Sequence, residues 1–172
     1  MLDCLVGSEM CIRDRLYCLA EGLVLGGISA YANALYPGIA NQAIALTFGI
    51  LAALLFLYKS RLIAATENFK LGVFSATFGI LIIYVLNLIL SLFGVSFMGP
   101  LFGNGLTGIL FSLFVIGIAS LNLVLDFDFI ENGADQGAPK YMEWYAAFGL
   151  MITLIWLYIE ILYLLMKLRS RR

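Results

Sequence analysis

Five long apolar stretches occupy nearly all of the chain after residue 15, and they limit the folds that it can adopt. A helix needs about 20 predominantly apolar residues to cross a bilayer. Five candidate spans meet that length, at about 16–36, 39–58, 71–93, 105–130 and 141–166. The sequence therefore predicts an all-α fold, a polytopic transmembrane helical bundle over residues 16–172 that lies in the lipid bilayer.

The composition supports a membrane protein and excludes several classes of function. Hydrophobic residues make up 63% of the chain and charged residues 12%, against roughly 45–50% and 25% in soluble domains. A soluble fold of this size could not hide so much apolar surface. The formal net charge of −1 offers no basic surface for nucleic acid.

An enzyme and a cofactor are not expected. Histidine is absent, which removes serine–histidine and cysteine–histidine dyads, the HExxH zinc motif and imidazole ligands to a metal. Intramembrane aspartyl proteases carry one aspartate in a GxGD motif, whereas Asp126 lies in LVLDFDF with no glycine before it. We therefore expect a non-catalytic membrane protein.

Residues 1–15, MLDCLVGSEMCIRDR, differ in composition from the remainder of the chain. The segment contains five charged residues with no clear amphipathic period, and it lacks the features of a signal peptide. The segment resembles translated sequencing-adapter read-through, so we expect a non-native leader; a genuine short interfacial segment is the alternative. Cys4, Cys11 and Cys18 have no CxxC spacing and predict neither a disulfide framework nor a zinc site.

Small and polar residues recur at helical spacing within the spans. Small residues let helix backbones approach closely, and polar residues form hydrogen bonds between helices. Most of these positions are therefore expected to pack the bundle. They are Gly22, Gly26, Ser29 and Asn33 in the first span, Thr77, Tyr84, Asn87 and Ser91 in the third, Ala119, Asn122 and Asp126 in the fourth, and Thr153, Trp156, Glu160 and Tyr163 in the last.

The connections and the basic residues leave the orientation open. Pro37-Gly38 predicts a tight turn, and residues 131–140 (ENGADQGAPK) are expected to form the most soluble loop. The positive-inside rule ties at four basic residues on each side of the membrane. They are Lys59, Arg61, Lys70 and Lys140 on one side, and Lys167, Arg169, Arg171 and Arg172 on the other.

Carboxylates set into the spans are the candidate functional groups. A charged side chain at the bilayer centre costs about 2.5–3.5 kcal/mol on insertion scales, so it is kept where it faces protein, a partner or water. Asp126 shares one face of the fourth span with Asn122, Glu160 lies well inside the last span, and Glu21 opens the first. Asp128 points about 200° away from Asp126 and is expected at the interface.

Buried carboxylates have a defined chemistry. Acids placed in this way can titrate near neutral pH. When ionised and close together, they offer hard oxygen ligands to calcium or to a monovalent cation, and protonation removes that affinity. The sequence therefore predicts a proton-gated cation site, with a satisfied hydrogen bond between helices as the alternative role of each acid.

A family resemblance rests on three segments, EGLVLGGISA, YPGIANQAI and LVLDFDFIENGADQGAPKYMEWYAAFGLMITLIWLYIEILYLLMKL. Over about residues 16–172 the chain resembles the Bax inhibitor-1 family and, within it, the bacterial YccA-like branch. The last span reads LYIEIL where many relatives have aspartate in place of Glu160. The resemblance implies about seven spans, so that this chain is an N-terminally truncated fragment showing five, and a place in the bacterial inner membrane.

The resemblance also implies a function. It implies a pH-sensitive calcium leak attributed to a pair of acids on the last two spans, which by position are Asp126 and Glu160. Those two acids are then the candidate calcium ligands. Some bacterial members of the family are linked instead to modulation of a membrane-bound protease, so a membrane protease is the candidate protein partner.

The spacing of the two acids limits how they can pair. Glu160 lies about 20 residues beyond Pro139, or some 30 Å along a helix, whereas Asp126 lies close to the same loop. The pair would then sit in opposite halves of the bilayer, unless the last helix begins outside the membrane or the two helices are strongly staggered. Glu21 lies on the same side as Asp126 by span counting and is the substitute partner.

Two functions remain open on the sequence. The first is a pH-dependent cation leak, probed by Asp126→Asn and Glu160→Gln. The second is a non-catalytic regulator that binds another membrane protein through its small residues, and bulky replacements at Gly22 or Gly26 would disrupt it.

Overall fold

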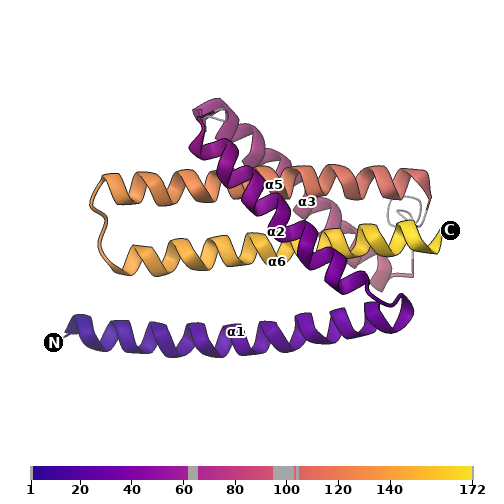
Figure 1. Ribbon diagram of the computed structural model, residues 1–172, viewed down its shortest axis with the longest axis horizontal. Coiled ribbons are helices and arrows are strands. Elements are labelled where there is room, and N and C mark those ends of the chain that lie inside the picture. Colours follow the sequence, from indigo (N-terminus) through magenta and orange to yellow (C-terminus); the bar gives the residue numbers. More distant parts are fainter. Residues whose placement is uncertain (1, 62–65, 95–102, 104, 172) are drawn as a thin grey trace.

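The computed structural model describes residues 2–61, 66–94, 103 and 105–171, with side chains from residue 15 onward. All regular secondary structure in the described part is helical (Figure 1), which confirms the all-α prediction. Its helices are α1 (Leu2–Leu35), α2 (Ile39–Lys59), α3 (Glu67–Leu92), α5 (Leu106–Asp135) and α6 (Tyr141–Ser170). All five are long and apolar enough to cross a membrane, the first of them over Arg15–Leu35.

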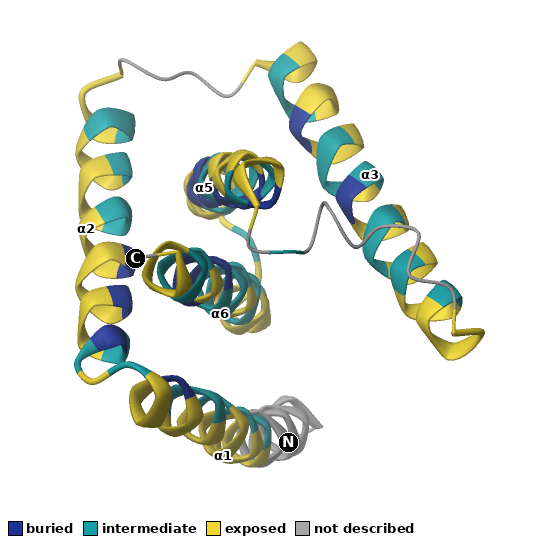
Figure 2. Cartoon of the chain, turned by 90° about the vertical axis from the view of Figure 1, so that its right-hand side faces the viewer, coloured by how far each residue is buried: buried dark blue, intermediate teal, exposed yellow. Residues whose placement is uncertain are grey.

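The antiparallel pair of α5 and α6 forms the centre of the bundle. Figure 2 shows this pair nearly end-on, with α1, α2 and α3 arranged around it. The packing agrees: α2 packs against both central helices, α3 against α5, and α1 against α2 and α6. The central pair therefore holds the other three helices in place.

Small side chains lie in the core where the helices pack together. Ala32, Ala43 and Ala119 are almost fully buried in the cluster that joins α1, α2, α5 and α6. Leu123 and Leu157 fill the space beside them and are also fully buried. Small residues at such positions let helix backbones approach without a clash, so the predicted packing role is confirmed at Ala119.

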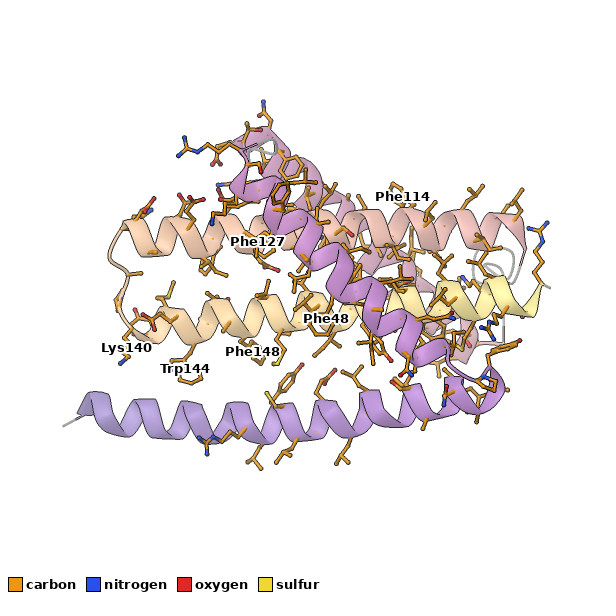
Figure 3. All side chains as sticks on the ribbon, in the orientation of Figure 1. Phe48, Phe114, Phe127, Lys140, Trp144 and Phe148 are labelled. Atoms are coloured by element: carbon orange, nitrogen blue, oxygen red, sulfur yellow. The ribbon has the colours of Figure 1, made fainter. Side chains whose placement is uncertain are left out.

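The middle of α1 lies alongside the first half of α6. Phe148 points from α6 toward α1 (Figure 3), where its ring centroid lies 5.0 Å from that of Tyr17. The Cys18 sulfur lies 3.7 Å from the sulfur of Met151. α1 runs without a break through residues 2–15. The side chains of Cys4 and Cys11 lie outside the described residues.

The turn between α1 and α2 forms as predicted at Pro37-Gly38. Gly38 has a φ of 84°, in the left-handed region that glycine adopts readily. Its N–H donates to Oδ1 of Asn33 over 2.7 Å. This bond uses a polar side chain near the end of α1 to close the turn.

The fourth span is longer than predicted. We expected it to end near residue 130 and residues 131–140 to form a loop, but α5 continues to Asp135. A hydropathy boundary marks where lipid contact ends, whereas helical hydrogen bonds continue through polar residues. The helix ends where Gly137, with a φ of 62°, donates to the carbonyl of Ala134, and Ala138 donates to that of Gly133.

One face of α3 is directed at the central pair. Val73 and Ile80 are its buried residues, and the partly buried Lys70, Thr77 and Tyr84 alternate with them at spacings of three and four. Such spacing keeps residues on one face over several turns of a helix. We call the face formed by these five residues the α3 seam, and its three polar members form the contacts described next.

Candidate functional site

Glu160 is buried between α6 and α3. Its Oε1 accepts a hydrogen bond from the Tyr84 hydroxyl of the α3 seam over 2.5 Å, and one from Trp156 Nε1 over 3.4 Å. Trp156 lies one turn earlier on α6, which places its ring on the same face. The carboxyl group that the sequence predicted to lie inside the bundle is therefore held there by two donors.

Lys167 brings a positive charge into the same part of the bundle. Its ammonium group donates to Ser112 Oγ over 2.8 Å and to the carbonyl of Gly108 over 3.2 Å. Ser112 is buried, near the start of α5. Lys167 follows Glu160 by seven residues, and the two opposite charges attract each other.

Asp126 lies on α5 opposite the first half of α6. Its carboxyl group interacts with Thr153, and a methyl group added at Gly149 would lie 3.9 Å from its Oδ1. Its other oxygen, Oδ2, is buried and has no hydrogen-bond partner among the described residues. An acid inside a membrane-spanning helix therefore keeps one carboxyl oxygen that no described residue binds.

Asn122, one turn before Asp126 on α5, connects this helix to α3. Its Nδ2 donates to Thr77 Oγ1 of the α3 seam over 2.7 Å and to the carbonyl of Ile118 over 3.0 Å. The sequence placed Asn122 and Asp126 on one face of the fourth span. The structure directs the first toward α3 and the second toward α6.

The structure does not bring Asp126 and Glu160 together as a pair. Asp126 faces Thr153, and Glu160 lies seven residues farther along α6, or about 10 Å along its axis. This separation of the two acids along the axis of α6 is smaller than the 30 Å that the sequence spacing suggested. Asp126 lies nine residues before the end of α5 at Asp135, so it is not close to the loop, and it faces α6 well inside that helix.

Glu21, the substitute partner in the prediction, interacts with Tyr17 on its own helix. Its helix, α1, contacts α2 and α6. The predicted set of Asp126, Glu160, Glu21 and Asn122 is thus spread over several levels of the bundle. No group of three or more Asp, Glu, Cys or His side chains that could hold a metal ion lies in the described part of the chain.

A charged cluster lies beyond Asp126, toward the end of α5. Asp128 forms an ion pair of 2.8 Å with Lys70 and accepts a hydrogen bond of 2.9 Å from Asn132. Glu131 accepts a hydrogen bond from the Tyr58 hydroxyl of α2. These contacts join α2 and α3 to the same end of α5.

Polar side chains thus follow one another along the interior between α3, α5 and α6. The sequence pointed to Asp126, Asn122 and Glu160, but it did not identify Lys167 as a member, because that residue was counted among the charges at the end of the chain. Its spacing of seven from Glu160 was the signal that both share a face. We call this set the polar interior; it consists of Thr77, Tyr84, Ser112, Asn122, Asp126, Thr153, Trp156, Glu160 and Lys167.

Comparison with known proteins gives a family. The family model described as Bax inhibitor 1 like matches residues 11–170. No curated protein and no solved structure matches the chain. The matched region takes in all five candidate spans. The chain is therefore an integral, multi-pass membrane protein that belongs to the Bax inhibitor 1 like family.

Proposed function

We propose that this protein mediates a pH-dependent leak of cations, with calcium as the expected ion, along the polar interior. The protein acts without catalysis, and its expected location is the bacterial inner membrane of the YccA-like branch. The single observation that carries the proposal is the buried Oδ2 of Asp126, which has no partner in the described part of the chain.

An unpaired carboxyl oxygen is costly inside a membrane. Such a residue is retained where it binds something transiently, because a permanent structural role would be served better by a paired group. Carboxylate, amide and hydroxyl oxygens are the ligands that calcium prefers. Asp126, the Asn122 side chain and Thr153 offer such atoms at neighbouring levels of α5 and α6.

Glu160 supplies a second carboxylate about 10 Å farther along α6. At the opposite end of the path, Asp128 and Glu131 lie at partly and fully exposed positions beside Asp126 on α5. Cations entering from that end would meet the exposed acids first, then Asp126, and then Glu160. Protons compete with cations for the same oxygen atoms, which gives the leak its dependence on pH.

The test is a flux measurement on the protein reconstituted in liposomes that contain a calcium dye, across about pH 5 to 8. Asp126→Asn keeps the shape of the side chain but stays uncharged at every pH. Its flux at neutral pH should therefore fall toward the level that the unmodified protein has at the acid end of the range, and the weaker pH dependence that remains should come from Glu160. Asp135→Asn, at the exposed end of the same helix, is the control, and its flux should depend on pH as that of the unmodified protein does.

Two results would contradict the leak. The first is flux no greater than that of empty liposomes while circular dichroism shows folded protein. The second is an Asp126→Asn variant whose flux follows pH as the unmodified protein does.

A second candidate function is binding to another membrane protein, with a membrane protease as the expected partner. It is favoured by the exposed surface of α1, where Gly22 and Gly26 have no atom within 4 Å of the position that a Cβ would take. In this case Gly22→Leu should reduce cross-linking to the partner in native membranes, whereas Asp126→Asn should leave it unchanged. If the protein is instead a cation leak, Asp126→Asn should change the calcium flux and Gly22→Leu should leave it unchanged.

A further inference from the structure

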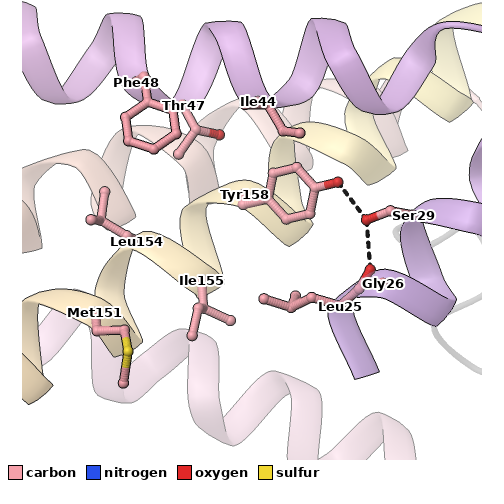
Figure 4. A pocket seen from close by; sticks show the side chains of 10 residues that line it. All are labelled: Leu25, Gly26, Ser29, Ile44, Thr47, Phe48, Met151, Leu154, Ile155 and Tyr158. Atoms are coloured by element: carbon pink, nitrogen blue, oxygen red, sulfur yellow. Dashed lines mark hydrogen bonds between the residues drawn. The ribbon is translucent and has the colours of Figure 1, made fainter. Parts of the chain in front are cut away.

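A cavity of about 310 Å³ lies on the other side of α6 from the polar interior, between α1, α2 and α6 (Figure 4). Ten residues line it, and none of them is charged. Seven are apolar side chains or glycine. The cavity is about twice the size of the roughly 150 Å³ apolar cavities that admit benzene.

The three polar side chains of the lining satisfy one another or their own helix. Ser29 Oγ lies 2.7 Å from the Tyr158 hydroxyl and donates to the carbonyl of Leu25 over 2.5 Å. Thr47 donates to the carbonyl of Ala43 over 2.8 Å. An occupant is therefore not required to form hydrogen bonds. A water molecule needs two to four polar partners and would not be held well here.

The cavity opens toward lipid near the middle of two spans. Phe48 and Ile44, which border it on α2, are 62% and 45% exposed. On α1 the border is Gly26, which has no side chain and no neighbour within 4 Å of the Cβ position. Gly26 and Thr47 lie near the centres of the candidate spans Arg15–Leu35 and Ile39–Lys59. The opening therefore faces the hydrocarbon core of the bilayer and not the layer of headgroups.

We propose that this cavity binds one acyl chain of a bilayer phospholipid. An acyl chain is uncharged and flexible, needs no hydrogen bonds, and is the molecule present at this depth. Lipid is as apolar as the cavity wall, so the driving force is the dispersion attraction between the acyl chain and the wall of a space that would otherwise be empty. The bound chain would pack against Tyr158, two residues before Glu160 on α6. The proposal does not depend on the leak.

The test uses a phosphatidylethanolamine that carries a diazirine at the middle of one acyl chain, in phosphatidylethanolamine–phosphatidylglycerol vesicles. After illumination, mass spectrometry of peptides from the full chain should find the label concentrated on the cavity walls of α1 and α6. Gly26→Leu places a side chain in the space and should reduce that labelling several-fold. Gly27→Leu is the matched control, because this neighbouring glycine is equally open but does not line the cavity.

A second pair of variants fills the cavity from α2. Ile44→Trp should reduce the label, and Leu46→Trp, at a position that is similarly exposed but does not line the cavity, should not. This pair decides the question if Gly26→Leu fails to fold by circular dichroism. Labels spread evenly over all lipid-facing helices and insensitive to the filling variants would overturn the proposal. Exclusion of the lipid label, with cross-links between two copies at these residues, would overturn it in favour of a protein occupant.

Discussion

At Glu160 a carboxyl group lies inside a membrane-spanning helix, and neighbouring side chains supply the donors that water would otherwise provide. Tyr84 gives the shorter of its two hydrogen bonds and is the one donor of the pair that comes from another helix. A buried acceptor that loses its partner costs about 1–3 kcal/mol, which exceeds the net gain of an ordinary hydrogen bond. The Tyr84 hydroxyl should therefore matter to stability out of proportion to its size.

Tyr84→Phe removes that hydroxyl and leaves the ring in place. We expect the free energy of unfolding to fall by about 1–3 kcal/mol, measured by thermal unfolding in detergent. Tyr163→Phe is the control: its side chain is 48% exposed on α6, and its loss should change stability by less than about 0.5 kcal/mol. Equal melting temperatures for the two variants would show that the Tyr84 hydroxyl does not stabilise the buried acid.

Lys167 joins the end of α6 to the start of α5 through Ser112. Lys167→Met and Ser112→Ala each remove one partner of the same hydrogen bond, so their effects should not add. A double-mutant cycle should give a coupling energy of about 0.5–3 kcal/mol. Arg169→Met, at an exposed position two residues away, should combine additively with Ser112→Ala. An additive Lys167–Ser112 cycle would mean that the hydrogen bond contributes nothing to stability.

The candidate residues were predictable from the sequence in part. Helical spacing placed Asn122 and Asp126 on one face of the fourth span, and apolar surroundings marked Glu160 as an interior acid. Spacing within one helix cannot identify the helix that a face contacts. Thr77 and Tyr84 were therefore predicted only to pack the bundle, and not as partners of Asn122 and Glu160. The position of the Lys167 ammonium group inside the bundle was not predicted, because its long side chain reaches back from the end of the helix.

At the scale of elements, the number and order of the five helices could be predicted because each carries enough apolar residues to cross a bilayer. Their ends could not, as α5 shows. The polar residues 131–135 extend it beyond the apolar run, and the stop is set by backbone geometry at Gly137 and not by hydropathy. This extension moves Asp126 away from the turn and changes which residues of α6 it faces.

Gly137→Ala tests that stop. Gly137 has a φ of 62°, where a Cβ is unfavourable, so the substitution should cost about 1 kcal/mol of stability. Gly133→Ala is the matched change inside the helix, where the new methyl group would lie 4.0 Å from that of Ala138. It should stabilise the protein by up to about 1 kcal/mol. Thermal unfolding of both variants in detergent gives the comparison, and the same sign for both would contradict the assignment of the cap.

At the scale of the whole molecule, the central pair of α5 and α6 separates two regions of different chemistry. The polar interior lies toward α3, and the apolar cavity lies toward α1 and α2. Because α6 forms a wall of both, a change in the position of this helix would reach both at once. Tyr158 lines the apolar cavity and Glu160 belongs to the polar interior, and the two residues are only two positions apart on α6.

The separation of the two acids gives the last prediction. A pair that shares one ion or one proton loses its function when either member is removed, so the second substitution adds nothing. Asp126 and Glu160 lie at different levels, about 10 Å apart along α6, and have different partners. Asp126→Asn combined with Glu160→Gln should therefore change the calcium flux by the product of the two single factors, measured in the same liposomes. A double variant no different from either single variant would show that the two acids act as one unit, which would require the helices to shift from the arrangement seen here.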